Sequence, residues 1–250
     1  MRILVSNDDG IRSPGVLLLA QAALAIGSDV WVVAPERKWT AASHQLSFDR
    51  DLTLTRMGDR MYGCSGAPAD SVVAAMTVLF GDGSRPDLVL AGINDKRNVG
   101  EDVAYSGTTA IAREATFWGV PAISLSREQC ETDGAGDLEA LRRLLRLLWN
   151  ARTDWAAAGH WLSINLPAAL PAPLTQARVG RDKIGAGCDI LQSTEKRIRY
   201  RIRRGRPGTI TPGDENACLA AGEISVVRYC WFAEAKLPDA VVAAWRSVME

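Results

Sequence analysis

The sequence predicts a three-layer α/β/α protein with a mostly parallel sheet and a smaller β-rich appendage at the C-terminal end. Short runs of Val, Ile and Leu alternate with helical patterns over the first two thirds of the chain. Polar residues follow several of these runs directly, as they do where parallel strands end at a functional edge. After residue 166 a stretch rich in Pro and Ala is followed by a segment in which apolar and charged residues alternate, as they do in a strand. We therefore expect a core over 1–166 and an appendage over 167–250 that includes a C-terminal helix able to pack back on the core.

The amino-acid composition limits the kinds of protein that this chain can be. The 250 residues, 47% of them hydrophobic and 23% charged, are enough for one large α/β unit with an appendage. Because 29 Lys and Arg balance 29 Asp and Glu, overall charge favours neither nucleic acid nor a membrane as a partner. No apolar segment reaches the ~18 residues that span a bilayer, and the first residues lack the layout of a signal peptide. Five scattered cysteines, none in C-x-x-C spacing, predict reduced thiols in a cytoplasmic protein and disfavour zinc.

The first elements form a βαβ unit, which predicts a Rossmann-like core. A buried strand over 3–5 precedes a helix that begins near Pro14 and runs to about 26, and a second buried strand covers 30–33. The two strands should be parallel, with a right-handed crossover. The first turn has Asn-Asp-Asp-Gly at 7–10 in place of G-x-G-x-x-G, which argues against a dinucleotide cofactor.

The remaining elements continue the alternation. Residues 36–47 are polar and irregular. Later segments are expected as a hairpin of strands 52–57 and 61–64, a helix 68–80, a strand 87–91, a helix 108–118, a strand 122–125, a leucine-striped helix 138–148, a strand 161–166, β-like runs 197–203 and 224–232, and a helix 238–249.

Two adjacent carboxylates follow the first strand. Asp8 and Asp9 would be costly at the edge of a core without a counter-charge, and Gly10 permits the break in the strand that turns both toward one point. A solvated turn is the alternative for Asp-Asp-Gly taken alone. Thr40 follows the second strand and Asn94 the third, so oxygen-bearing side chains meet at one edge of the sheet. Such ligands suit Mg²⁺ or Mn²⁺.

A candidate anion site lies further along the chain. Tyr105-Ser106-Gly107-Thr108 opens a helix, and free N–H groups at a helix start bind anions, here with two hydroxyls and a glycine beside them. A divalent cation next to an anion site suits phosphate chemistry.

Five motifs in this order and spacing carry a resemblance to a known family. They are NDDG at 7–10, APERKWTAASHQLS at 34–47, GAPAD at 66–70, GIN at 92–94 and NVGEDVAYSGT at 98–108. On these motifs the chain resembles the SurE survival proteins, which are divalent-metal-dependent 5′/3′-nucleotidases. The resemblance covers roughly the first 125 residues.

The resemblance implies a hydrolase that releases phosphate from nucleoside monophosphates, with short polyphosphate as a further substrate. One divalent ion per subunit would activate a water that attacks phosphorus; a covalent attack by Asp8 or Asp9 is the rival mechanism. His44 is the candidate proton donor to the leaving oxygen. The implied metal ligands are Asp8, Asp9, Thr40 and Asn94, and the implied phosphate-binding residues are Asn98, Ser106, Gly107 and Thr108.

Two departures from the family pattern bear on function. Thr40 stands where most relatives have Ser, which keeps the hydroxyl. Lys96 stands where a Gly is usual in G-I-N-x-G-x-N, and a Lys there would be strained if the position requires a positive φ, or would gate the substrate. The alternative function is therefore a catalytically weak protein that binds nucleotide or polyphosphate. The intact Asp8, Asp9 and Asn94 favour the enzyme.

Two further segments yield expectations. The Arg-rich strand beginning at Arg197 could suggest nucleic acid, but one charged face on a strand is usually solvated, so we disfavour that partner. The family resemblance implies that a hairpin in this region builds a homodimer or homotetramer. Glu114, in the helix after Thr108, is expected at the surface.

Overall fold

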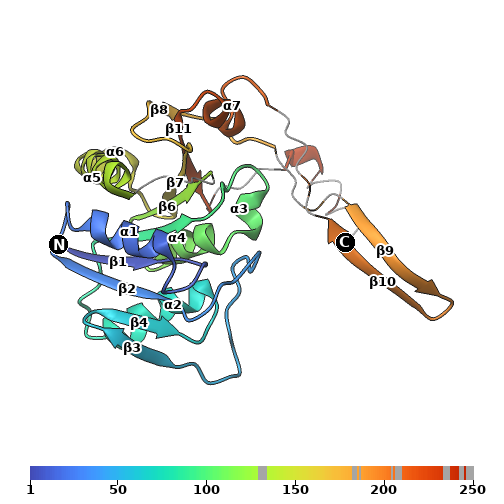
Figure 1. The fold of residues 1–250 in the computed structure, drawn as a ribbon, viewed down its shortest axis with the longest axis horizontal. Helices are drawn as coiled ribbons and strands as arrows, with labels where there is room; N and C mark the ends of the chain where they lie inside the picture. The colour runs from blue at the N-terminus through green and yellow to red at the C-terminus, as the bar shows by residue number, and fades with distance from the viewer. Residues whose placement is uncertain are drawn as a thin grey trace.

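The computed structural model describes residues 1–128, 134–181, 185, 187–203, 205, 210–232, 237–241 and 245. It confirms the three-layer α/β/α architecture and the mostly parallel sheet (Figure 1). The strands are β1 (Arg2–Ser6), β2 (Asp29–Pro35), β3 (Leu54–Gly58), β4 (Met61–Cys64), β5 (Leu88–Asn94), β6 (Ala122–Arg127), β7 (His160–Leu166), β8 (Leu174–Gln176), β9 (Gly187–Thr194), β10 (Arg197–Arg203) and β11 (Ile224–Cys230). The helices are α1 (Pro14–Ala23), α2 (Pro68–Ala74) with its π-helical continuation η1 (Ala75–Leu79), α3 (Asp102–Tyr105), α4 (Gly107–Phe117), α5 (Gly134–Asn150), α6 (Arg152–Trp155) and α7 (Glu215–Ala220).

The main sheet has nine strands in the order β3-β4-β2-β1-β5-β6-β7-β11-β8. Strands β4, β2, β1, β5, β6 and β7 are all parallel. The chain leaves β1 toward β2 on one side and returns to β5 on the other. The carboxyl ends of β1 and β5 therefore form the switch point at which open α/β sheets place their ligands.

Alternation along the buried strands divides the core into two layers. Ile3 and Val5 of β1 pack with α1 and α5 on one face of the sheet. Leu4 packs with α2 and α4 on the other face. Both layers are closed to solvent because successive side chains of a strand point to opposite faces and each face carries helices.

Two crossovers of the sheet have opposite hands. The connection from β1 to β2 and the connection from β6 to β7 run in opposite directions across the sheet, yet α1 and α5 pack on the same face. Since both connections join parallel strands, one of them departs from the right-handed rule that sequence reasoning would apply to each.

The sheet continues past residue 166. Strand β11 pairs antiparallel with β7, and β8 pairs with β11. Strands β9 and β10 instead pair with each other in a two-stranded sheet and extend away from the body as a hairpin (Figure 1). The division into two domains at 166 stays a prediction. Most of the helix expected over 238–249 lies outside the described residues, among which no helix is long and apolar enough to span a bilayer.

Candidate active site

The Asn-Asp-Asp-Gly turn is held by its own side chains. Asn7 Nδ2 donates to the Gly10 carbonyl at 3.1 Å and to Ser13 Oγ at 2.6 Å, and Ser13 in turn caps α1. Gly10 has a φ of 100°, which L side chains rarely adopt. The predicted break after the first strand is thus present, and both aspartates line the cavity beyond β1.

Hydrogen bonds hold the irregular loop over 36–47 on both sides of Thr40. The Trp39 N–H donates to the Asp8 carbonyl at 2.7 Å. Ser43 donates its N–H to the Tyr105 carbonyl at 2.9 Å and its hydroxyl to the Ala104 carbonyl at 2.7 Å. Thr40 lies between these anchors and is therefore presented to the same cavity as Asp8.

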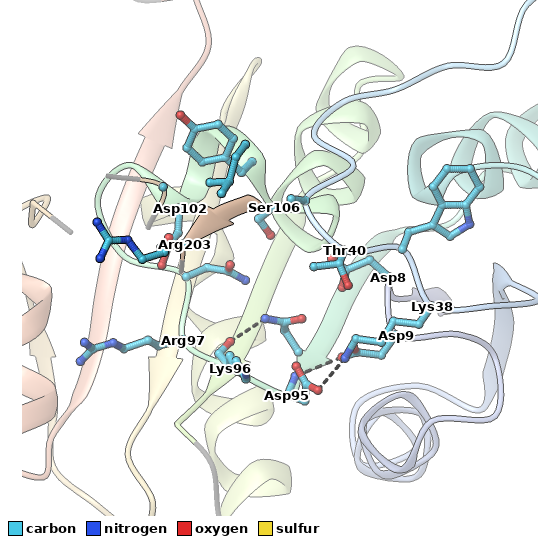
Figure 2. Close-up of a pocket in the computed structure, with 17 residues that line it drawn as sticks. Asp8, Asp9, Lys38, Thr40, Asp95, Lys96, Arg97, Asp102, Ser106 and Arg203 are labelled. Atoms are coloured by element: carbon cyan, nitrogen blue, oxygen red, sulfur yellow. Dashed lines mark hydrogen bonds and ion pairs between the residues drawn. The ribbon is translucent and has the colours of Figure 1, made fainter. Parts of the chain in front are cut away.

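One cavity of about 300 Å³ collects most of the predicted site residues (Figure 2). It lies beyond the carboxyl ends of β1 and β5, and α3 and the end of β10 contribute to its wall. Lys38, Asp95 and Arg203 also line it and were not among the predicted residues, and Arg97 lines it close to Lys96. His44, Gly107 and Thr108 do not line it. The predicted residues that do are Asp8, Asp9, Thr40, Asn94, Lys96, Asn98 and Ser106.

Asp8 is a buried carboxylate with little compensation. Burial raises the pKa of Asp8 to about 6, the charge of Asp9 adds to the rise, and hydrogen bonds from Thr108 oppose it. The Thr108 hydroxyl donates to Asp8 Oδ1 at 2.5 Å. Gly107 must lack a side chain here, because a Cβ would lie 2.8 Å from the Asp8 Cβ. The start of α4 thus packs directly against this carboxylate.

Asp9 and Asn94 complete the oxygen-rich wall. Asp9 Oδ1 contacts the Lys38 ammonium, and Asp9 Oδ2 accepts the Asp95 N–H at 3.1 Å. Asn94 Nδ2 donates to the Lys96 carbonyl at 2.6 Å. Because the amide nitrogen of Asn94 is engaged, its Oδ1 is the atom left to face a cation.

These residues fit a hard divalent cation. In the part of the chain that the structure describes, no three His, Cys, Asp or Glu side chains group as a metal site would require. A cation would therefore use the hydroxyl of Thr40 and the amide oxygen of Asn94 beside the two carboxylates, an all-oxygen set suited to Mg²⁺ or Mn²⁺. The negative charge of Asp8 is buried and has no cationic partner among the residues that the structure describes, and Asp9 already contacts an ammonium group. Both observations indicate that a cation at this position would be stabilised.

The anion side of the cavity is built on the start of α4. Ser106 caps the helix, and its Oγ accepts the Thr109 N–H at 3.1 Å while the hydroxyl proton stays available to a ligand. Asn98 is fixed by its backbone N–H to Asn165 Oδ1 at 2.7 Å and by Nδ2 to Ser126 Oγ at 2.7 Å. One N–H of the Asn98 amide remains for the cavity.

Glu215 supports this wall from a distant part of the chain. Its Oε2 accepts the N–H groups of Gly100 at 3.0 Å and Gly180 at 3.1 Å, and its side chain also contacts Asn165 at 3.5 Å. Burial raises the pKa of Glu215 above its usual range. No local pattern could have indicated this residue, because its partners lie 35 to 115 positions away along the chain.

His44, which is partly buried, pairs with the buried Glu114. The expectation of a surface Glu114 is wrong: the side chain is buried, accepts from Trp118 Nε1 at 2.8 Å, and contacts His44 Nε2 at 2.7 Å. Arg113 Nε donates to His44 Nδ1 at 3.0 Å. Both ring nitrogens of His44 are therefore engaged, and its role as a proton donor stays a prediction that would require this network to open.

Lys96 is not strained. Its backbone is outside the left-handed region, so the substitution for glycine carries no conformational penalty of the kind considered above. Its side chain lines the cavity together with Lys38, Arg97 and Arg203. This basic rim is suited to a substrate with several negative charges.

Comparisons with known proteins agree with this geometry. The family model described as survival protein SurE matches residues 3–185. The chain is 36% identical over 244 residues to the 5′-nucleotidase SurE of Paramagnetospirillum magneticum, covering 92% of this chain and 90% of that protein. It is 37% identical over 241 residues to the 5′-nucleotidase SurE of Rhodopseudomonas palustris strain BisB18, covering 90% and 92%. The solved structure of the SurE protein from Aquifex aeolicus superposes with a TM-score of 0.79 at 25% identity, over 100% of both chains. With a family model that spans most of its length and relatives this similar over nearly all of it, the chain belongs to the SurE family.

Proposed function

We propose that this protein is a divalent-metal-dependent phosphomonoesterase that hydrolyses nucleoside 5′- or 3′-monophosphates; the relatives named 5′-nucleotidase SurE support the action on 5′-nucleotides. One observation carries the proposal. Asp8, Asp9, Thr40 and Asn94 come from three separate strand ends and line one cavity with Ser106 at the start of α4. That arrangement puts a cation-binding wall next to an anion-binding helix terminus, which is the combination phosphate-ester hydrolysis requires.

The side chains of this cavity have distinct proposed roles. Asp8, Asp9, Thr40 and Asn94 would hold one Mg²⁺ or Mn²⁺ per subunit. When bound, such an ion polarises a phosphoryl oxygen and lowers the pKa of water. Ser106, at the start of α4, would bind the non-bridging oxygens as negative charge develops. Direct phosphate contacts by Asn98, Gly107 and Thr108, and the proton donation by His44, stay predictions.

We favour attack by water over attack by an aspartate. Asp8 Oδ1 accepts from Thr108, and both oxygens of Asp9 have partners, so three of the four oxygens of these carboxylates are already engaged in other contacts. The stereochemical course at phosphorus tests this: a single displacement by water should invert the configuration of an isotopically chiral thiophosphate substrate. Retention of configuration, the result of two displacements through a phosphorylated aspartate, would establish the covalent route.

The deciding experiment is phosphate release from a panel of nucleoside monophosphates and short polyphosphates, with Mn²⁺, Mg²⁺ or a chelator. We expect turnover with metal and none with the chelator. The variant D9N should abolish turnover and keep the fold, since it removes a charge without removing core volume. Nucleotide binding without release under any metal would instead support the catalytically weak binding protein, whose main rationale was strain at Lys96.

We also propose that the protein is a homodimer or homotetramer built through the β9–β10 hairpin. Alternation along β10 puts Ile198, Tyr200 and Ile202 on one face, each about 60% exposed, and Ile190 of β9 lies opposite Tyr200. A bare apolar face of this kind is typical of an interface. Light scattering should give a multiple of 27.0 kDa for the wild type and a monomer for Y200D. The cytoplasmic location stays a prediction from cysteine usage.

A further inference from the structure

The ammonium of Lys38 lies within the cation-binding wall. Its Nζ contacts Asp9 Oδ1 and is 2.6 Å from Asp95 Oδ2, so it bridges the two carboxylates (Figure 2). The side chain of Asp9 is only 8% exposed, whereas those of Lys38 and Asp95 are about half exposed. Lys38 thus connects a buried carboxylate of the site to a second carboxylate at its rim.

The neighbours of Lys38 hold it in this position. The adjacent Trp39 is hydrogen-bonded to the Asp8 carbonyl at 2.7 Å, and the guanidinium of Arg37 stacks on the Trp39 ring at 4.3 Å. On the other side, the Asp95 N–H donates to Asp9 Oδ2. Asp95 therefore contacts Asp9 through its backbone and Lys38 through its side chain, and the three residues form one connected unit.

A divalent ion and this ammonium would draw on the same carboxylate. Asp9 would hold a metal ion fully only if the ammonium withdraws, because two positive charges within a few ångströms repel each other. Asp95 offers an alternative partner at the rim, where the flexible stem of Lys38 can hold its charge in contact with solvent. The unit could consequently adopt two arrangements: the one seen here, with the ammonium on both carboxylates, and one with the ammonium on Asp95 alone.

Resting on the proposed function, we propose that Lys38 is a tethered cation that competes with the divalent metal ion for Asp9, and that Asp95 receives the displaced ammonium. Lys38 neutralises Asp9 in the metal-free protein and so sets how much free metal is needed to load the site. Once displaced, its ammonium lies beside the cavity, where an incoming phosphate would meet it.

The test measures Mn²⁺ binding without turnover, by the electron paramagnetic resonance signal of free Mn²⁺. Lys96→Met is the matched control: it removes one positive charge from the same cavity, and Lys96 has no carboxylate partner among the described residues. We expect K38M to tighten Mn²⁺ binding roughly tenfold, and K96M to change it far less. In addition, D95N should weaken Mn²⁺ binding in the wild type and have a clearly smaller effect in the K38M background.

Equal changes in K38M and K96M would refute the proposal, because they would trace the effect to the charge of the cavity as a whole. Weaker Mn²⁺ binding in K38M would refute it as well. Thermal melts without metal add a second readout: K38M should melt below wild type, and Mn²⁺ should reverse that order. Phosphate release by the wild type at saturating Mn²⁺ tests the proposed function separately, so a protein that hydrolyses nucleotides but fails the Mn²⁺ comparison overturns only the role of Lys38.

Discussion

Replacing Asp8 by Asn should stabilise the metal-free protein while destroying its ability to bind metal. The Asp8 carboxylate is buried, lies next to Asp9, and is partly compensated by Thr108. Asparagine has nearly the same shape, and its amide oxygen can still accept from the Thr108 hydroxyl. The substitution therefore removes the cost of a buried charge without opening a cavity.

The magnitude follows from the pKa of Asp8, which burial raises from 3.8 to about 6. A carboxyl with a raised pKa binds protons more tightly when folded, so its unfavourable contribution grows as pH rises from 3.8 to 6 and is complete above 6. In free energy of unfolding, D8N should exceed wild type by about 3 kcal/mol at pH 7.5 and by roughly half as much at pH 5.

Urea denaturation in a chelating buffer at the two pH values measures this difference. Asp51→Asn, at an exposed position, controls for the loss of one carboxylate and should change stability little. Excess Mn²⁺ should narrow the gap, because only the wild type gains about 2.7 kcal/mol when the ion is present at a hundred times its Kd. A D8N protein no more stable than wild type at pH 7.5, or a gap that does not shrink at pH 5, would refute the reasoning.

Three further substitutions test the surroundings of the site. Gly107→Ala should remove most activity because its Cβ would lie 2.8 Å from that of Asp8; kcat measures this, and Gly136→Ala, which meets open space, should retain activity. Glu215→Leu should raise KM and lower the free energy of unfolding by about 2–4 kcal/mol, since two buried N–H groups lose their acceptor. E215Q keeps an acceptor oxygen, so its KM and its free energy of unfolding should stay close to those of the wild type. Glu114→Ala should cost about 1–3 kcal/mol in urea denaturation, and an unchanged midpoint would show that its buried hydrogen bonds contribute nothing.

Much of the fold could be predicted because its signals are local. Apolar runs, capping residues and the period of each helix are contained within a few residues, and they correctly indicated β1 through β7 and the long helices. Single-turn α3 and α6 are too short to show a period, so they were missed. The pairing of β11 with β7 also escaped prediction, because a β-like run does not reveal which edge it joins.

The sequence by itself determined the chemistry of the site: adjacent carboxylates followed by glycine, hydroxyl and amide oxygens after other strands, and a helix start rich in N–H groups. Only the tertiary structure decided which other side chains pair with these site residues. Lys38 on Asp9, Glu215 beneath the Asn98 loop and Glu114 on His44 are contacts between segments far apart in the chain. Burial and charge pairing depend on those contacts, and no local pattern records them.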